Sequence, residues 1–238
     1  METVAVLLAA GRGSRFGSSV NKIFQNMGGI TVLERAARAL LGHPAISSMI
    51  VVGAAGEENR IGSLLAGSFT GRRFRVIRGG ETRQMSALLG LRAAREMAAD
   101  KGGGRVAVLV HDAARCFLRA DTVTVLLETI KRFHCGAAPA IPVNDTIRLM
   151  DETGRTILKT MPRDRLAAMQ TPQGADLDVL LEAAELAEKE KVTVTDDLEL
   201  LIRIGFPVRL IKGDPLNIKL TTPEDFYFAE ACCIPRIG

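Results

Sequence analysis

A stretch near the N-terminus, LLAAGRGSRFGSSVNKIFQ at residues 7–25, combines residue types that bind an anion. It begins as an apolar run and then contains three glycines and three cations, namely Gly11, Gly13, Gly17, Arg12, Arg15 and Lys22. Glycines let successive backbone N–H groups turn toward one anion, and the cations would neutralise its charge. Because ligands of open α/β sheets bind beyond the carboxyl ends of the strands, the stretch predicts a phosphate-binding loop after the first strand.

The familiar phosphate-loop patterns fit this stretch poorly. No G-x-x-x-x-G-K-(S/T) string occurs, which excludes a Walker A loop. The spacing G-x-G-x-x-x-G places Phe16 where a dinucleotide fingerprint requires glycine, and the next helix signal comes only at Thr31. Long loops in compact domains are usually functional, and three cations suit a triphosphate better than a dinucleotide. A solvated basic turn is the alternative that the residues alone leave open.

Strand-like and helix-like segments alternate along the chain. Short apolar or β-branched runs predict strands at 4–10, 49–55, 73–79, 105–112, 136–143 and 206–213. Amphipathic patterns predict helices at 31–42, 86–100, 120–133, 175–190 and 195–205. Thr31 and Glu34 have the spacing of a capping box, and Thr195 is expected to cap the last of these helices. The alternation predicts one α/β domain over residues 1–238, with a mostly parallel, doubly wound sheet and helices on both faces.

One region interrupts this alternation. Residues 144–173 alternate polar and apolar residues around a D-E-T-G turn, which predicts a protruding β-hairpin. A hairpin inserted in an α/β domain usually packs against something, and another subunit is a natural candidate.

Charge and composition limit the possible functions. The net charge of +4 and the pI near 9.0 suit an acidic small ligand, and no lysine-rich tail or basic-aromatic pattern suggests a nucleic-acid surface. The N-terminus lacks the positive region of a signal peptide, and no apolar run approaches the ~20 residues of a membrane span. We therefore expect a cytoplasmic protein with neither a nucleic acid nor a membrane as partner. The four cysteines form no C-x-x-C pair, so we expect reduced thiols.

Three further polar residues are expected to have structural roles. His111 should be buried and bonded to the backbone. Asp196 and Asp197 should be acids in the first turn of a helix, where they favour the helix dipole.

The loop and four later stretches resemble a known family. The loop resembles A-A-G-x-G-x-R-(F/M)-x…P-K-Q, a signature of sugar-phosphate nucleotidyltransferases. The other stretches are GGETRQMSALLGL (79–91), VHDAARCF (110–117), DRLAAMQTPQG (164–174) and NIKLTTPED (217–225). Together they are similar to the 2-C-methyl-D-erythritol 4-phosphate cytidylyltransferase family over about residues 4–231. The resemblance implies a Rossmann-like nucleotidyltransferase fold and transfer of CMP from CTP to a polyol phosphate, with release of pyrophosphate, in the non-mevalonate isoprenoid pathway.

The resemblance assigns a first set of residues to CTP. Arg15 and Lys22 would be catalytic cations that stabilise the pentacovalent phosphate during an in-line attack by the second substrate. Mg²⁺ would bridge phosphate oxygens, with Asp112 as its expected protein ligand. The residues expected to contact CTP are Ala9, Ala10, Gly11, Gly13, Gly80, Glu81, Arg83, Ser86 and Asp112.

A second set of residues is assigned to the polyol phosphate, namely Thr146, Arg163, Lys219 and Arg115. In the family the hairpin arm, here about residues 137–170, reaches into the active site of the partner subunit, so we expect a homodimer. Thr146 and Arg163, also candidates for catalysis, lie on this arm. A guanidinium fork and a hydroxyl suit a phosphate monoester. From the residues alone, R-D-R at 163–165 could equally be a solvated charge cluster, Asp112 a helix cap, and Arg115 a surface ion pair or a residue that fixes its own segment.

Three positions depart from the family pattern. Asn21 stands in place of a proline before Lys22, Ile23 replaces a glutamine and Cys116 replaces another proline. Because the charged residues are retained, we expect activity, and each lost proline should loosen its loop by at most about 0.4–1 kcal/mol of chain entropy. The alternatives are a cytidylyltransferase for another polyol phosphate, such as ribitol 5-phosphate, and a catalytically inactive nucleotide-binding regulator. A dinucleotide oxidoreductase comes last.

Overall fold

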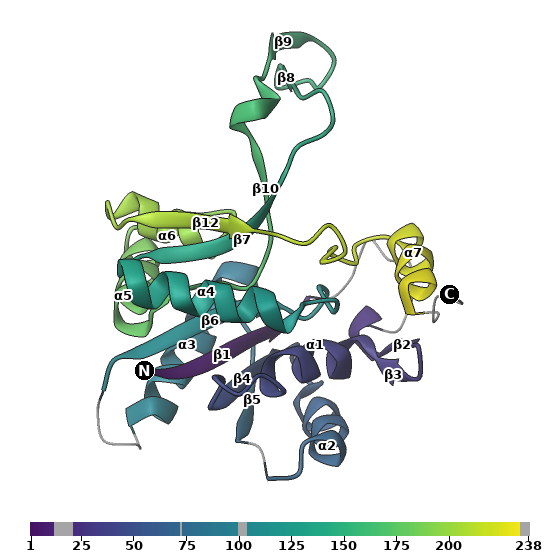
Figure 1. The fold of residues 1–238 in the computed structure, drawn as a ribbon, viewed down its shortest axis with the longest axis vertical. Helices are drawn as coiled ribbons and strands as arrows, with labels where there is room; N and C mark the ends of the chain where they lie inside the picture. The colour runs from purple at the N-terminus through teal and green to yellow at the C-terminus, as the bar shows by residue number, and fades with distance from the viewer. Residues whose placement is uncertain (12–20, 72, 100–103, 234–238) are drawn as a thin grey trace.

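A central sheet of eight strands forms the middle layer of the protein (Figure 1). The computed structural model describes residues 1–11, 21–71, 73–99 and 104–233. The strand order is β10-β7-β11-β6-β1-β4-β5, and β12 also pairs with β7. The strands are β1 (Glu2–Ala9), β4 (Ser48–Gly53), β5 (Phe74–Arg78), β6 (Val106–Asp112), β7 (Gly136–Pro142), β10 (Ala167–Met169), β11 (Gln173–Asp176) and β12 (Val208–Lys212).

The pairing of these strands confirms a mostly parallel sheet. β1 runs parallel to β4 and to β6, β4 runs parallel to β5, and β12 runs parallel to β7. Only β10 and β11 pair antiparallel within this sheet, among the strands of the described residues. The chain builds outward from β1 to β4 and β5, and then returns to place β6 on the other side of β1. This reversal creates a crevice beyond the carboxyl ends of β1, β4 and β6, where open α/β sheets bind ligands.

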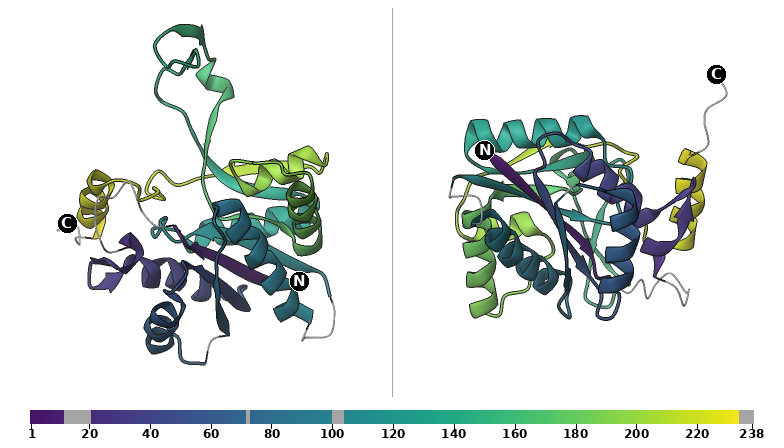
Figure 2. Two further views of the ribbon diagram at one scale, coloured as in Figure 1. Left: turned by 180° about the vertical axis from the view of Figure 1, so that it is seen from behind. Right: turned by 90° about the horizontal axis from the view of Figure 1, so that it is seen from below.

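Helices cover both faces of the sheet, as the doubly wound prediction requires. The helices are α1 (Val32–Leu41), α2 (Glu58–Ser68), α3 (Arg83–Ala99), α4 (Ala120–Phe133), α5 (Leu177–Lys189), α6 (Asp197–Arg203) and α7 (Pro223–Cys233). One apolar core joins the sheet to α1, α2, α4 and α7, and a second joins it to α3, α5 and α6. Viewed from below, the teal α4 lies on one side of the sheet, and the blue α3 and green α5 lie on the other (Figure 2). Among the described residues, no helix is long and apolar enough to cross a membrane.

Local sequence signals explain how two of the helices begin. Thr31 and Glu34 form the predicted capping box on α1, because the hydroxyl of Thr31 accepts the Glu34 N–H and the Glu34 carboxylate accepts the Thr31 N–H. The prediction for α6 was wrong by one residue. Asp196, not Thr195, is its N-cap, and its carboxylate accepts the N–H of Glu199. An ionised carboxylate at this position satisfies a free N–H and also favours the helix dipole.

The helix α2 has no counterpart among the predicted helices. Only Ile61 and Leu65 of its residues are buried, and the glycines Gly62 and Gly67 weaken its helical pattern. The missed helix therefore reflects a narrow apolar stripe, which gives little periodicity to detect.

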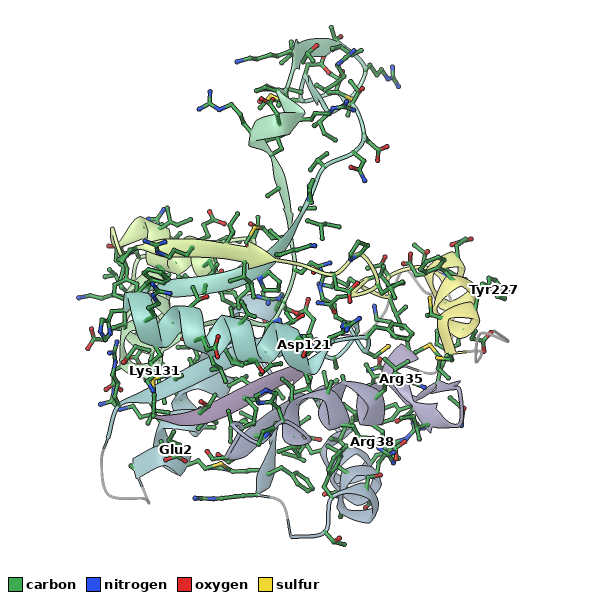
Figure 3. All side chains as sticks on the ribbon, in the orientation of Figure 1. Glu2, Arg35, Arg38, Asp121, Lys131 and Tyr227 are labelled. Atoms are coloured by element: carbon green, nitrogen blue, oxygen red, sulfur yellow. The ribbon has the colours of Figure 1, made fainter. Side chains whose placement is uncertain are left out.

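The predicted hairpin projects from the body of the protein (Figure 1). It consists of β8 (Arg148–Met150) and β9 (Ile157–Thr160), paired antiparallel, followed by a short 3-10 helix, η3 (Arg163–Arg165). Its side chains extend into the space around it (Figure 3), and four large apolar ones are at least half exposed, namely Leu149, Met150, Ile157 and Leu158. Such an exposed apolar set is typical of a surface that another chain covers.

Candidate active site

A cleft of about 970 Å³ opens beyond the carboxyl ends of β1, β4, β5 and β6. The turn after β1 lines one side of it, and the segment that joins β5 to α3 lines another. The cleft brings together many of the predicted residues, from segments far apart in the sequence: Ala9, Ala10, Gly11, Lys22, Gly80, Glu81, Arg83, Ser86, Asp112 and Lys219. Gly13 and Arg15 lie outside the described residues.

Asp112, the last residue of β6, lies between two cations in this cleft. Its Oδ1 accepts a hydrogen bond from Arg83 Nε at 3.1 Å, and its Oδ2 lies 2.7 Å from Lys219 Nζ. Burial would raise the pKa of Asp112, but Arg83 and Lys219 hold that pKa well below its usual range. Asp112 is therefore a carboxylate at neutral pH, and it fixes the positions of both cations.

Arg83 is also bound by a carboxylate that the sequence did not assign to the site. Its Nη1 and Nη2 lie 3.1 and 2.7 Å from Oδ1 and Oδ2 of Asp197, which is 2% exposed. Burial would lower the pKa of Arg83, but the carboxylates of Asp197 and Asp112 outweigh it and raise that pKa. Asp197 is in the first turn of α6, as predicted, but its side chain is buried and binds Arg83. Nothing in the local sequence marks this contact, because the two residues are 114 positions apart.

Buried polar side chains form hydrogen bonds that fix the backbone around Asp112. The hydroxyl of Thr171 accepts the Asp112 N–H at 3.1 Å and lies 2.9 Å from His111 Nδ1, to which it can donate. His111 Nε2 then donates to the carbonyl of Arg115 at 2.9 Å. Burial lowers the pKa of His111 to about 4, so the ring is neutral. This confirms the expectation that His111 is buried and bonded to the backbone.

Arg115 connects the same segment to the loop that carries Lys219. Its Nη1 donates to the carbonyl of Asn217 at 2.7 Å and its Nη2 to the carbonyl of Met169 at 3.2 Å. It is not a surface ion pair, since burial lowers its pKa and both of these partners are backbone carbonyls. Arg115 is not among the described residues that line the cleft, so contact between Arg115 and substrate stays a prediction.

The segment between β5 and α3 packs closely against neighbouring side chains. A Cβ at Gly79 would lie 2.7 Å from that of Ala10, and a Cβ at Gly80 would lie 2.1 Å from Met85 Cγ. Ser86 is buried, accepts the N–H of Gly80 at 3.2 Å and donates to the carbonyl of Thr82 at 2.8 Å. Glycine is needed here because any side chain would collide with its neighbours, and Ser86 then fixes the shape of the turn.

Lys22 lies in a short 3-10 helix, η2 (Lys22–Phe24), and lines the cleft. Its Nζ donates to the carbonyl of Leu220 at 2.6 Å, which links η2 to the loop that carries Lys219. Both lysines line the same cleft, so the cation expected to act on CTP and the cation expected to bind the second substrate share one cavity.

Two predicted residues lie away from this cleft. Thr146 and Arg163 are exposed on the arm, and neither is among the residues that line the cleft in the described part of the chain. Arg163 Nη1 donates to the carbonyl of Asn144 at 2.8 Å. Arg163 also borders a smaller hollow of about 400 Å³ at the base of the arm, next to β7 and β12.

Comparisons with known proteins identify the family of the chain. A sequence model of the 2-C-methyl-D-erythritol 4-phosphate cytidylyltransferase family matches residues 3–234. The chain belongs to this family. A protein of that name from Geobacillus kaustophilus is 38% identical, with 100% of both chains aligned. Another, from Halalkalibacterium halodurans, is 35% identical, with 97% of this chain and 96% of the relative aligned.

Solved structures of the family share the fold. The 2-C-methyl-D-erythritol 4-phosphate cytidylyltransferase of Thermus thermophilus has a TM-score of 0.75 and 32% identity, and the match covers 98% of this chain and 99% of that one. The 4-diphosphocytidyl-2C-methyl-D-erythritol synthase of Anaerococcus prevotii has a TM-score of 0.82 and 27% identity, and the match covers 97% and 95%. The protein is therefore an enzyme with the nucleotidyltransferase fold, as the resemblance implied.

Proposed function

We propose that the protein transfers CMP from CTP to 2-C-methyl-D-erythritol 4-phosphate, giving 4-diphosphocytidyl-2-C-methyl-D-erythritol and pyrophosphate, in the cytoplasm. The observation that carries the proposal is the cleft, in which Lys22, Arg83, Asp112 and Lys219 meet glycine-rich backbone at the carboxyl ends of the strands. Membership of the family supports the choice of both substrates.

The reaction we propose is an in-line attack of the substrate phosphate on the α-phosphorus of CTP. It needs no covalent protein intermediate, because positioning the two anions and stabilising the growing charge supply the catalysis. Lys22 and Arg15 would stabilise the charge on the α-phosphate and the leaving pyrophosphate. Lys219 would bind the phosphate of the second substrate, and the turn at Gly80 would read the cytosine through its backbone.

The residues of the cleft fit a magnesium ion brought in by the nucleotide. The described residues contain no group of three or more His, Cys, Asp or Glu side chains placed to hold a metal ion, so that part of the chain offers no cage of its own. Mg²⁺ commonly binds one or two carboxylates together with substrate phosphates, and Asp112 supplies one ionised carboxylate in the cleft. Asp112 would hold the ion, which would supply charge neutralisation between the phosphates.

For the second substrate we propose a homodimer in which the arm of one subunit completes the cleft of the other. One nucleotidyltransferase domain would span the chain, and the arm at about residues 137–170 would carry Thr146 and Arg163 to the partner. The support is that both residues are exposed, lie away from the cleft of their own chain, and sit on an arm with exposed apolar side chains. Mixing Lys22→Ala protein with Arg163→Ala protein tests this, because only a shared site restores activity.

Pyrophosphate release with Mg²⁺ and CTP tests the reaction itself. Three reactions are compared, with 2-C-methyl-D-erythritol 4-phosphate, with ribitol 5-phosphate and with no acceptor. Release with the first acceptor alone supports the proposal. Release only with ribitol 5-phosphate would keep the chemistry and overturn the substrate. Binding of CTP without release from either acceptor would indicate an inactive nucleotide-binding regulator.

A further inference from the structure

Asn21 connects the turn that carries Lys22 to a helix outside the cleft. Its Oδ1 accepts the N–H of Ile23 at 3.4 Å and thereby caps η2. Its Nδ2 donates to Oε2 of Glu57 at 2.9 Å. A single side chain therefore holds both the start of η2 and the start of α2, which lie 36 residues apart in the sequence.

Glu57 is free to make this contact because it does not cap its own helix. It is the N-cap residue of α2, and its side chain accepts no capping hydrogen bond. One turn further along α2, the guanidinium of Arg60 lies 3.8 Å from the centre of the Phe24 ring, at the end of η2. The start of α2 therefore contacts η2 at both of its ends, through an ion-assisted hydrogen bond and through a cation–π contact.

Further contacts among the described residues anchor η2 to the core and to the loop that carries Lys219. Ile23 and Phe24 are buried in the core that includes α1, and Lys22 reaches across to the carbonyl of Leu220. Asn21, which directly precedes η2, is only half-buried. The contact between Asn21 and Glu57 therefore fixes the residue directly before Lys22.

We propose that Asn21 and Glu57 are positioning residues that hold Lys22 in its reactive place. This rests on the proposed function of Lys22 as a cation that acts on the α-phosphate. Neither residue is assigned a catalytic role, because neither is among the described residues that line the cleft. Positioning of a charge in the transition state affects turnover more than ground-state binding of CTP.

The backbone at Asn21 suggests a second way to fix the same turn. Its φ of −57° and ψ of 127° lie in the range that proline adopts. A proline at this position would hold the backbone by its ring and would no longer need Glu57. The sequence position at which the family carries proline is therefore held here by a hydrogen bond.

The test compares kcat and KM for CTP in four single variants and one double variant, all made in the full-length enzyme. Glu57→Ala should lower kcat about five- to tenfold with KM for CTP within twofold, whereas Glu57→Gln, which keeps an acceptor oxygen, should remain within twofold of the parent. Glu58→Ala is the matched control, because it removes a carboxylate from the next residue of the same helix. Asn21→Pro should retain most of the parental kcat. In the double variant, adding Glu57→Ala to Asn21→Pro should cause no further loss of kcat.

Two results would overturn the inference. The first is that Glu57→Ala and Glu58→Ala have the same kcat. The second is that Glu57→Ala lowers kcat by the same factor in the parent and in the Asn21→Pro variant, which would indicate a general effect on folding. Lys22→Ala separates this inference from the proposed function. A full loss of activity there, with Glu57→Ala unaffected, refutes only the positioning role. An unchanged rate in Lys22→Ala refutes the catalytic role and the positioning role together.

Discussion

Removing the charge of Asp197 should destabilise the protein far more than removing the charge of an exposed aspartate. The change is Asp197→Asn, which keeps the size of the side chain but replaces one oxygen that faces Arg83 with an N–H donor. Arg83 would then have one of its two terminal nitrogens opposite another donor. The pair is buried on the aspartate side, because the side chain of Asp197 is only 3% exposed.

The size of the effect follows from what remains around Arg83. Removing one partner of a buried ion pair costs about 3–5 kcal/mol. Here the asparagine keeps one acceptor, Arg83 Nε keeps its bond to Asp112, and the Arg83 side chain is 30% exposed and so partly solvated. We therefore expect the free energy of unfolding to fall by about 2–3 kcal/mol, at or below the lower end of that range.

Urea denaturation followed by circular dichroism measures this change. With an m-value of about 2–3 kcal/mol/M, the midpoint should fall by about 1 M. Asp178→Asn is the matched control, because Asp178 pairs with Arg95 at 2.9 Å but both side chains are more than half exposed. Exposed pairs contribute about 0–1 kcal/mol. Equal midpoints for the two variants would refute the view that burial gives the Arg83 pair its weight.

Three further outcomes are expected. Lys22→Ala should lower kcat by about 10²–10³-fold in the pyrophosphate assay, the scale for one group that stabilises transition-state charge. Gly90→Ala should lower the unfolding free energy, measured with urea, by about 1–3 kcal/mol, because a Cβ there would lie 2.4 Å from Val6 Cγ1. Gly62→Ala should raise the unfolding free energy by up to about 1 kcal/mol, because a Cβ there has its nearest neighbour at 4.0 Å. Burial lowers the pKa of His43, so the unfolded chain binds the proton first and stability falls as pH drops below about 6.5; His43→Gln should show a smaller loss between pH 7.5 and 5.5.

The sequence was sufficient to predict the layers of the fold. Continuous apolar runs such as 4–10 mark strands buried on both faces, and such strands occur in parallel sheets. The capping box of Thr31 and Glu34 placed the start of α1 correctly. By contrast, α2 was missed because only two of its residues, Ile61 and Leu65, are buried, and propensity alone does not identify such a helix.

The site was predictable where one short segment carries both the residue and its role. Lys22, Asp112 and Lys219 follow strands or turns with distinctive sequences, and the fold brings them to one cleft. Asp197 was interpreted as a helix-terminal acid, because its partner comes from a distant segment and only the folded chain shows the pairing. The same holds for Asn21, whose departure from the family pattern suggested a looser turn until its contact with Glu57 was visible.

The arm gives the proposed dimer a consequence for how the enzyme behaves on dilution. Half or more of the surface of Leu149, Met150, Ile157 and Leu158 is exposed when the chain is alone. If the partner covers these side chains and also receives Arg163, each cleft is complete only in the associated form. Activity per mole of enzyme should then fall as total enzyme is diluted below the dissociation constant, and rise again on concentration. The specific activity of the enzyme would then depend on its own concentration as well as on the substrate concentration.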